Sequence, residues 1–149
     1  PAADYPAALL ALGATIKTNT RSLSAEDFFT GLFETALDEG EMVTAVEFTA
    51  PEKSGYSKFR NPASRYAMTG VFVCKHGDGS VGVGVAGAGS DGAFRSSEME
   101  TALAGDFTSA ALETISIDSS DLMSDMHASA EYRANLIKVM GKRAVQQAE

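Results

Sequence analysis

Three glycines in the middle of the chain have the spacing of a nucleotide-binding loop. Gly82-Val-Gly84-Val-Ala-Gly87 matches the G-x-G-x-x-G pattern, in which a pyrophosphate binds at the start of a helix. That chemistry needs a strand before the glycines and a helix that opens within them. Here the glycines lie inside a predicted strand, and further turn residues follow. We therefore favour close packing of backbone or of a helix on these small residues over phosphate binding.

Few other side chains are arranged for catalysis. The single thiol is Cys74, and the imidazoles of His76 and His127 are far apart, so no recognised spacing predicts a zinc or other metal site. Cys74 lies in an apolar segment and is predicted to be a small buried side chain. No nucleophile elbow, P-loop or carboxylate pair stands out. The residues taken alone predict no self-contained catalytic group.

The composition is that of a folded acidic protein. Of 149 residues, 44% are hydrophobic, which is enough for a buried core. The formal net charge of -8 argues against nucleic acid and anionic membranes as partners, because both require clustered lysine and arginine. No apolar run is long enough to span a membrane, and a single cysteine is typical of a reducing compartment, so we expect a soluble cytoplasmic protein. The chain starts at Pro1 without an initiating Met, and we interpret it as an incomplete piece of a longer protein.

The first third of the chain is predicted to mix short helices and strands. Gly13 is a typical residue after the end of a helix. Ser24 and Asp27 have the spacing of a capping box, which predicts a helix start. The predicted elements are a helix over 5–12, a strand over 14–18, a helix over 27–32 and a strand over 42–49.

Further along the chain, the pattern changes from strands to helices. Gly77-Asp-Gly79 and Ser90-Asp-Gly92 are typical tight turns, so the strands that flank them form a three-stranded antiparallel meander. Residues 53–56 are predicted to be a loop. The predicted elements are strands over 57–60, 66–75, 80–86 and 93–95 and helices over 97–103, 108–115 and 129–147. With helices covering one face of a sheet, the expected class is α+β.

Four stretches of the sequence together resemble one protein family. They are Pro1-Ala-Ala-Asp-Tyr-Pro-Ala-Ala-Leu-Leu-Ala-Leu-Gly-Ala14, then Asp27-Phe-Phe-Thr-Gly31 with Glu34-Thr-Ala-Leu37 and Gly40-Glu-Met-Val43, then Lys58-Phe-Arg60 with Ala63-Ser-Arg-Tyr-Ala67, and finally Ser129-Ala-Glu-Tyr-Arg133. In this order and spacing they resemble the FAD-binding medium subunit of molybdenum hydroxylases, of the carbon monoxide dehydrogenase and xanthine dehydrogenase type. The resemblance covers essentially the whole chain.

The resemblance implies a fold, cofactors and partners. Residues 1–50 would be the C-terminal end of an FAD-binding α/β subdomain. Residues 54–149 would be a C-terminal domain with a three-stranded antiparallel sheet packed with a three-helix bundle. The cofactor would be FAD, although the family's phosphate-binding loops lie upstream of the stretch that matches Pro1 and are absent from this sequence. Molybdopterin and iron–sulfur clusters would belong to a large and a small partner subunit, in a dimer of heterotrimers.

The resemblance also implies three cofactor-binding residues, and no catalytic or metal-binding ones. Asp4 matches an acidic residue that hydrogen-bonds the ribityl region of FAD, and it could equally be the N-cap of the first helix. Val43 matches an aliphatic residue near the isoalloxazine ring, and its alternative is a plain core residue of a strand. Arg60 matches a basic position near the flavin, where a cation would favour the reduced anionic form, and its alternative is a solvated surface arginine. Tyr66 lies in the same neighbourhood and ranks below these three.

The function that the resemblance implies is electron transfer in an oxidoreductase. The subunit would pass electrons from iron–sulfur centres via FAD to an external acceptor. The alternative is a non-catalytic docking module of the same kind of complex that does not contact flavin. Because the phosphate-binding loops are absent, we expect the chain alone to be inactive and to bind FAD weakly or not at all.

Overall fold

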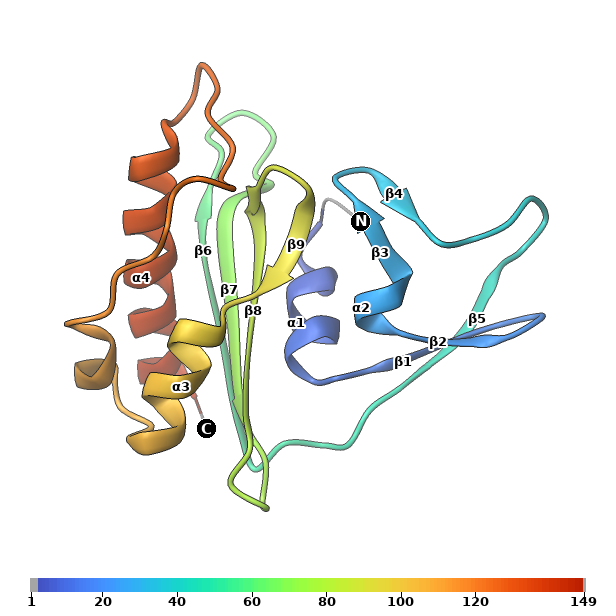
Figure 1. Ribbon diagram of the computed structural model, residues 1–149, viewed down its shortest axis with the longest axis horizontal. Helices are drawn as coiled ribbons and strands as arrows, with labels where there is room; N and C mark the ends of the chain where they lie inside the picture. Colours follow the sequence, from blue (N-terminus) through green and yellow to red (C-terminus); the bar gives the residue numbers. More distant parts are fainter. Residues whose placement is uncertain (1–2, 149) are drawn as a thin grey trace.

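The computed structural model describes residues 3–148, in which short helices and strands precede a larger sheet with helices on both faces (Figure 1). The first part contains α1 (Tyr5–Ala11), β1 (Thr15–Thr18), β2 (Ser22–Ser24), α2 (Ala25–Phe28), β3 (Phe29–Gly31), β4 (Glu34–Thr35) and β5 (Val43–Glu47). The second contains β6 (Lys53–Arg60), β7 (Ala67–Lys75), β8 (Val81–Gly89), β9 (Gly92–Arg95), α3 (Ser97–Gly105), the 3-10 helix η1 (Ser109–Leu112) and α4 (Ala130–Gln147). This mixture of helices and antiparallel sheets agrees with the predicted class.

Local signals in the sequence set the N-terminal elements. Gly13 follows α1 with a φ of 57°, a left-handed conformation that favours glycine. The Ser24 hydroxyl accepts a hydrogen bond from the Asp27 N–H at 3.0 Å and so caps α2, as the capping box predicts. The predicted helix over 27–32 is wrong in extent. The chain leaves the helix after Phe28, because β3 pairs with β4 instead.

The larger sheet has four antiparallel strands in the order β6-β7-β8-β9, where three were predicted. Strand β6 begins at Lys53, where a loop was expected, and pairs with β7 along its length. Gly55 lies inside this strand because a helix packs on it: a Cβ at Gly55 would lie 2.1 Å from the backbone oxygen of Ala144 in α4. A glycine within a strand can therefore indicate close approach of another backbone rather than a turn.

The main core lies between this sheet and the C-terminal helices. Figure 1 shows α4 along one face of the sheet and α1 against the other. Side chains alternate along each strand, so one set of valines from β7 and β8 faces α3 and α4. The fully buried members of this core include Val71, Val73, Val83, Val85, Met99, Ile137 and Leu112.

The glycines of β8 face the other way and make room for α1. A Cβ at Gly82 would lie 1.9 Å from the Ala11 backbone oxygen, and a Cβ at Gly84 would lie 1.9 Å from the Ala7 backbone oxygen. The G-x-G spacing is thus a packing surface for a helix, which confirms the interpretation favoured from the sequence. Cys74 on β7 is also buried here, as predicted, and its thiol donates to the Ala11 oxygen at 3.3 Å.

One predicted helix is much shorter than expected. Helix α3 ends at Gly105, two residues beyond the predicted helix over 97–103. Helix α4 begins after Ser129, whose hydroxyl accepts a hydrogen bond from the Tyr132 N–H at 3.2 Å. The segment predicted as a helix over 108–115 forms only the 3-10 turn η1. Two α-helices and one 3-10 turn therefore cover this face, and the predicted three-helix bundle does not form within residues 3–148.

Residues 3–148 contain neither a helix that could span a membrane nor a group of side chains that could hold a metal ion. None of its helices combines the length and the apolar character needed to cross a lipid bilayer. Its histidine, cysteine and acidic side chains also form no group of three or more that could hold a metal ion.

Candidate functional site

The carboxylate of Asp4, immediately before α1, is held by two side chains of β6. The Tyr56 hydroxyl donates a hydrogen bond to Oδ1, and the Lys58 ammonium group pairs with Oδ2, each at 2.7 Å. Asp4 occupies the N-cap position of α1, as the alternative interpretation predicts, but its side chain makes no capping hydrogen bond to the helix. The carboxylate instead links the start of α1 to a strand 52 to 54 residues later.

The two side chains that bind Asp4, those of Tyr56 and Lys58, lie on the same face of β6. Tyr56 and Lys58 are two residues apart and so point to the same side of the sheet, toward α1. Gly70 of β7 lies directly opposite Lys58 in the register. A Cβ at Gly70 would lie 2.4 Å from the Tyr56 hydroxyl oxygen. The missing side chain at Gly70 therefore leaves the space through which the Tyr56 phenol reaches Asp4.

The surroundings favour the charged form of this carboxylate. Burial would raise the pKa of Asp4, but hydrogen bonds from Lys58 and Tyr56 and the charges of Lys58 and Arg60 outweigh burial and lower it. Burial and the hydrogen bond to Asp4 raise the pKa of the Tyr56 phenol. At neutral pH Asp4 is therefore an acceptor and Tyr56 a donor. The Asp4 side chain is still 44% exposed, and each oxygen keeps a lone pair for a further hydrogen bond.

The three residues predicted to contact flavin do not all lie together. Arg60 ends β6, is exposed, and adds its charge to those around Asp4. Val43 begins β5 in the small sheet β2-β1-β5, which lies beyond α1 from β6 in Figure 1. Val43 is 39% exposed, so it is not a core residue among residues 3–148. The structure brings Asp4 and Arg60 into one neighbourhood and leaves Val43 apart from it.

The strand that carries Val43 also presents apolar side chains that residues 3–148 leave uncovered. Every residue of β5 is exposed. Met42, Val46 and Phe48 lie on or beside this strand and are between 38% and 63% exposed. Neighbouring exposed apolar side chains are typical of a surface that meets another structure.

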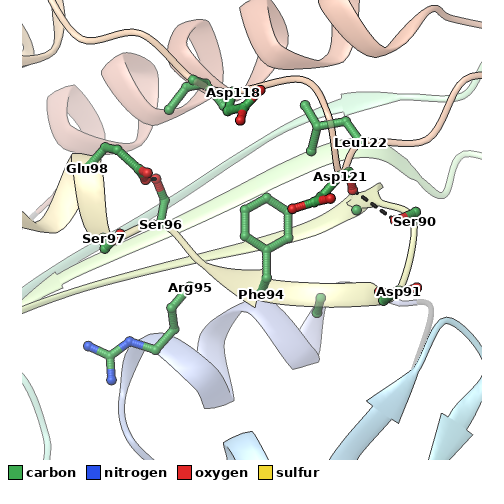
Figure 2. Close-up of a pocket in the computed structure, with 14 residues that line it drawn as sticks. Ser90, Asp91, Phe94, Arg95, Ser96, Ser97, Glu98, Asp118, Asp121 and Leu122 are labelled. Carbon is green, nitrogen blue, oxygen red and sulfur yellow. Dashed lines mark hydrogen bonds between the residues drawn. The ribbon is translucent and has the colours of Figure 1, made fainter.

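A separate cavity of about 330 Å³ lies between the β8–β9 hairpin and the segment over 117–122. Figure 2 shows Phe94 of β9 pointing toward Asp121 and Leu122 of that segment, while Arg95 points away from it. The Ser90 hydroxyl closes one end by donating to the Asp121 backbone oxygen at 3.0 Å. None of the predicted site residues lines this cavity.

Comparisons with known proteins show which proteins the chain is similar to. Residues 1–51 match the family described as the FAD binding domain in molybdopterin dehydrogenase. Over 157 residues the chain is 33% identical to the glyceraldehyde dehydrogenase medium chain of Sulfolobus acidocaldarius, covering 97% of this chain and 56% of that relative. The chain is thus similar over almost its whole length to FAD-binding medium subunits of molybdenum hydroxylases. This confirms the resemblance seen in the sequence.

Further proteins are similar to the chain in sequence or in fold. The nicotine 6-hydroxylase medium subunit of Paenarthrobacter nicotinovorans is 29% identical over 159 residues, which are 99% of this chain and 56% of that subunit. Carbon monoxide dehydrogenase from Oligotropha carboxidovorans matches with a TM-score of 0.76 and 27% identity, over 97% of this chain and 55% of that chain. Quinoline 2-oxidoreductase from Pseudomonas putida 86 has the same fold, with a TM-score of 0.75, 23% identity and the same coverage. The chain spans about half the length of these relatives.

The surroundings of Asp4 fit the cofactor of an FAD-binding family. The ribityl chain of FAD carries several hydroxyl groups, and a half-exposed carboxylate held in its charged form is a strong acceptor for such donors. Asp4 also lies within the residues that match the FAD binding domain. Asp4 is therefore a residue that could hold the hydroxyl-bearing part of FAD, with the positive charge of Arg60 nearby.

Sequence reasoning missed the residues that position Asp4. Lys58 was part of the family resemblance, but neither Lys58 nor Tyr56 was assigned to the site, because the segment over 53–56 was predicted to be a loop. The alternation of Tyr56 and Lys58 could have placed both on one strand face. Their pairing with Asp4 had no sequence signal, since it depends on where α1 packs.

Proposed function

We propose that the chain is the C-terminal portion of the FAD-containing subunit of a molybdenum hydroxylase, and that the whole subunit passes electrons from iron–sulfur centres to an external acceptor. The observation that supports this proposal is the environment of the Asp4 carboxylate. This carboxylate lies in the segment matched to an FAD binding domain, is partly exposed, and is kept charged by Lys58 and Tyr56. Residues 1–50 would end the FAD-binding domain, and residues 54–149 would be the C-terminal domain.

Each predicted site residue has a distinct part in this proposal. Asp4 accepts hydrogen bonds from hydroxyl groups of the cofactor, Arg60 supplies positive charge, and Val43 offers an aliphatic surface. FAD, when bound, supplies the electron transfer itself. The exposure of Val43 and its neighbours on β5 supports a role in contact rather than in the core.

The proposed partners are a large molybdopterin subunit and a small iron–sulfur subunit, in a cytoplasmic dimer of heterotrimers. Two relatives are named medium chain and medium subunit, which supports an assembly with further subunits of other sizes. The relatives are named for different substrates, so substrate choice is proposed to belong to the other subunits.

Retention of FAD by the full-length medium subunit, assembled with its partners, tests this function. Asp4→Ala is expected to weaken FAD binding about tenfold or more, because a hydrogen bond to a charged group contributes about 1.5–3 kcal/mol. Flavin absorbance per complex after gel filtration measures retention, and flavin fluorescence during titration measures affinity. Asp91→Ala removes an exposed aspartate in the β8–β9 turn and serves as the matched control. Equal FAD retention in both variants would remove Asp4 from the site.

The docking alternative has its own supporting observation in the exposed apolar side chains of β5. A pure docking module would assemble with partner subunits whether or not flavin is present. Co-purification of the flavin-free full-length subunit with those partners separates the two proposals, when it is combined with the FAD measurement on the same sample. Normal assembly together with no FAD binding by the wild-type subunit would favour docking alone.

A further inference from the structure

The hydrogen bonds to the Asp4 carboxylate come from one side, that of the sheet. The two donors, the Tyr56 hydroxyl and the Lys58 ammonium group, both come from the sheet, one to each carboxylate oxygen. The Lys58 side chain is only 18% exposed, whereas the Asp4 side chain is 44% exposed. The donors are thus on the protein side of the carboxylate, and the remaining acceptor positions face outward.

We propose that Tyr56 and Lys58 are positioning residues that orient the Asp4 carboxylate toward a hydroxyl-bearing cofactor, with Gly70 providing the space that this arrangement requires. The inference rests on the proposed function, in which Asp4 binds the ribityl region of FAD. It adds three residues that the family resemblance did not assign to the site.

Two donors fix the carboxylate more firmly than a single ion pair would. An exposed ion pair between flexible side chains contributes little to stability and does not define an orientation. Here each oxygen has its own donor at 2.7 Å, so rotation of the carboxylate would break two hydrogen bonds at once. A group held in this way binds a ligand without first losing side-chain freedom, which is how preorganisation increases affinity.

Gly70 makes the arrangement sterically possible. The position of a Cβ on Gly70 is 2.4 Å from the Tyr56 hydroxyl oxygen and 3.1 Å from the ring carbon that carries it. Any side chain at Gly70 would push the phenol away from Asp4. The glycine in the middle of the apolar strand β7 is thereby explained by the site and not by a turn.

The test measures FAD affinity in the full-length medium subunit within its assembled complex, after removal and titration of FAD. Tyr56→Phe and Lys58→Met are each expected to weaken FAD binding about tenfold, since each removes one hydrogen bond from a charged acceptor. Lys58→Arg, which keeps the charge and a donor, is expected to restore most of the affinity. Tyr132→Phe and Lys53→Met make the same chemical changes at exposed positions and are expected to leave FAD affinity unchanged.

A double-mutant cycle separates positioning from a merely structural role. In an Asp4→Ala background, Tyr56→Phe and Lys58→Met are expected to cause no further loss of FAD affinity, because the group that they orient is gone. A structural role would lower the unfolding temperature of the flavin-free complex equally in both backgrounds. Tyr56→Phe keeps the ring, so it remains informative if Lys58→Met fails to fold.

The outcomes distinguish this inference from the function on which it rests. If Asp4→Ala weakens FAD binding but Tyr56→Phe and Lys58→Met leave it within twofold of the wild type, the positioning role is overturned and the proposed function stands. If Asp4→Ala has no effect on FAD affinity, the Asp4 carboxylate does not bind FAD. The positioning role of Tyr56 and Lys58 then fails together with the assignment of Asp4 to the site. If the wild-type complex takes up no FAD, the proposed function itself fails.

Discussion

Two carboxylates, Asp4 and Glu41, organise the N-terminal part of the molecule at the scale of single residues. Glu41 precedes β5 and its side chain is only 2% exposed. Its oxygens accept hydrogen bonds from the hydroxyls of Thr18 and Thr20, from the Arg21 guanidinium and from the Asp38 N–H, at 2.6 to 2.9 Å. The hydrogen bonds from Arg21 and Thr18 lower the pKa of Glu41 far below its ordinary value. Glu41 lies in one of the stretches that carry the family resemblance, and its role here is to tie the start of β5 to the β1–β2 turn.

Glu41→Gln is expected to destabilise the chain in a pH-dependent way. Because the folded-state pKa is lowered, the contribution of Glu41 is fully present above its ordinary pKa of 4.5 and is lost progressively as the pH falls below that value. The difference in unfolding free energy between wild type and variant should therefore be largest at pH 7 and shrink toward pH 3. Denaturant unfolding at both pH values measures it, with Glu39→Gln as the exposed control. A difference that is equal at pH 3 and pH 7 would contradict this account of Glu41.

At the scale of elements, glycines decide how the helices meet the sheet. Turn glycines were predictable, since Gly79 and Gly92 have positive φ values in the two hairpins where short-range sequence signals place them. Glycines against which a neighbouring backbone packs closely were harder to interpret from the sequence. Gly55 was assigned to a loop because its partner, α4, lies almost 90 residues away and leaves no local signal. The segment over 108–115 has apolar residues at helical spacing, yet only one 3-10 turn forms there.

Gly82→Ala is expected to destabilise the chain by about 1–3 kcal/mol, the usual cost of overpacking a core. The new Cβ would meet the Ala11 backbone oxygen at 1.9 Å, so α1 would have to move away from β8. Gly77→Ala is the matched control, because nothing lies within 4 Å of its Cβ position. Urea unfolding of both variants measures the difference. Equal stability of Gly82→Ala and Gly77→Ala would show that α1 does not pack on β8 as described.

At the scale of the whole molecule, α1 joins the two predicted domains. It comes from the segment matched to the FAD binding domain, but it packs against β7 and β8 of the larger sheet. The fold class, the hairpins and the terminal helix were predictable from local periodicity and turn residues. The candidate site was predictable only in part. The resemblance implied Asp4 and Arg60, whereas the partners Tyr56 and Lys58 become neighbours of Asp4 only through the packing of α1. Val43 was assigned with them, yet it lies on a separate small sheet.

A crystal structure of the full-length medium subunit with FAD bound tests the central claim most directly. The claim predicts that an Asp4 carboxylate oxygen lies within about 3.2 Å of a ribityl hydroxyl of the cofactor, the range of an ordinary hydrogen bond. It also predicts that Tyr56 and Lys58 keep their hydrogen bonds to the same carboxylate. A bound FAD whose hydroxyl groups make no contact with Asp4 would contradict it.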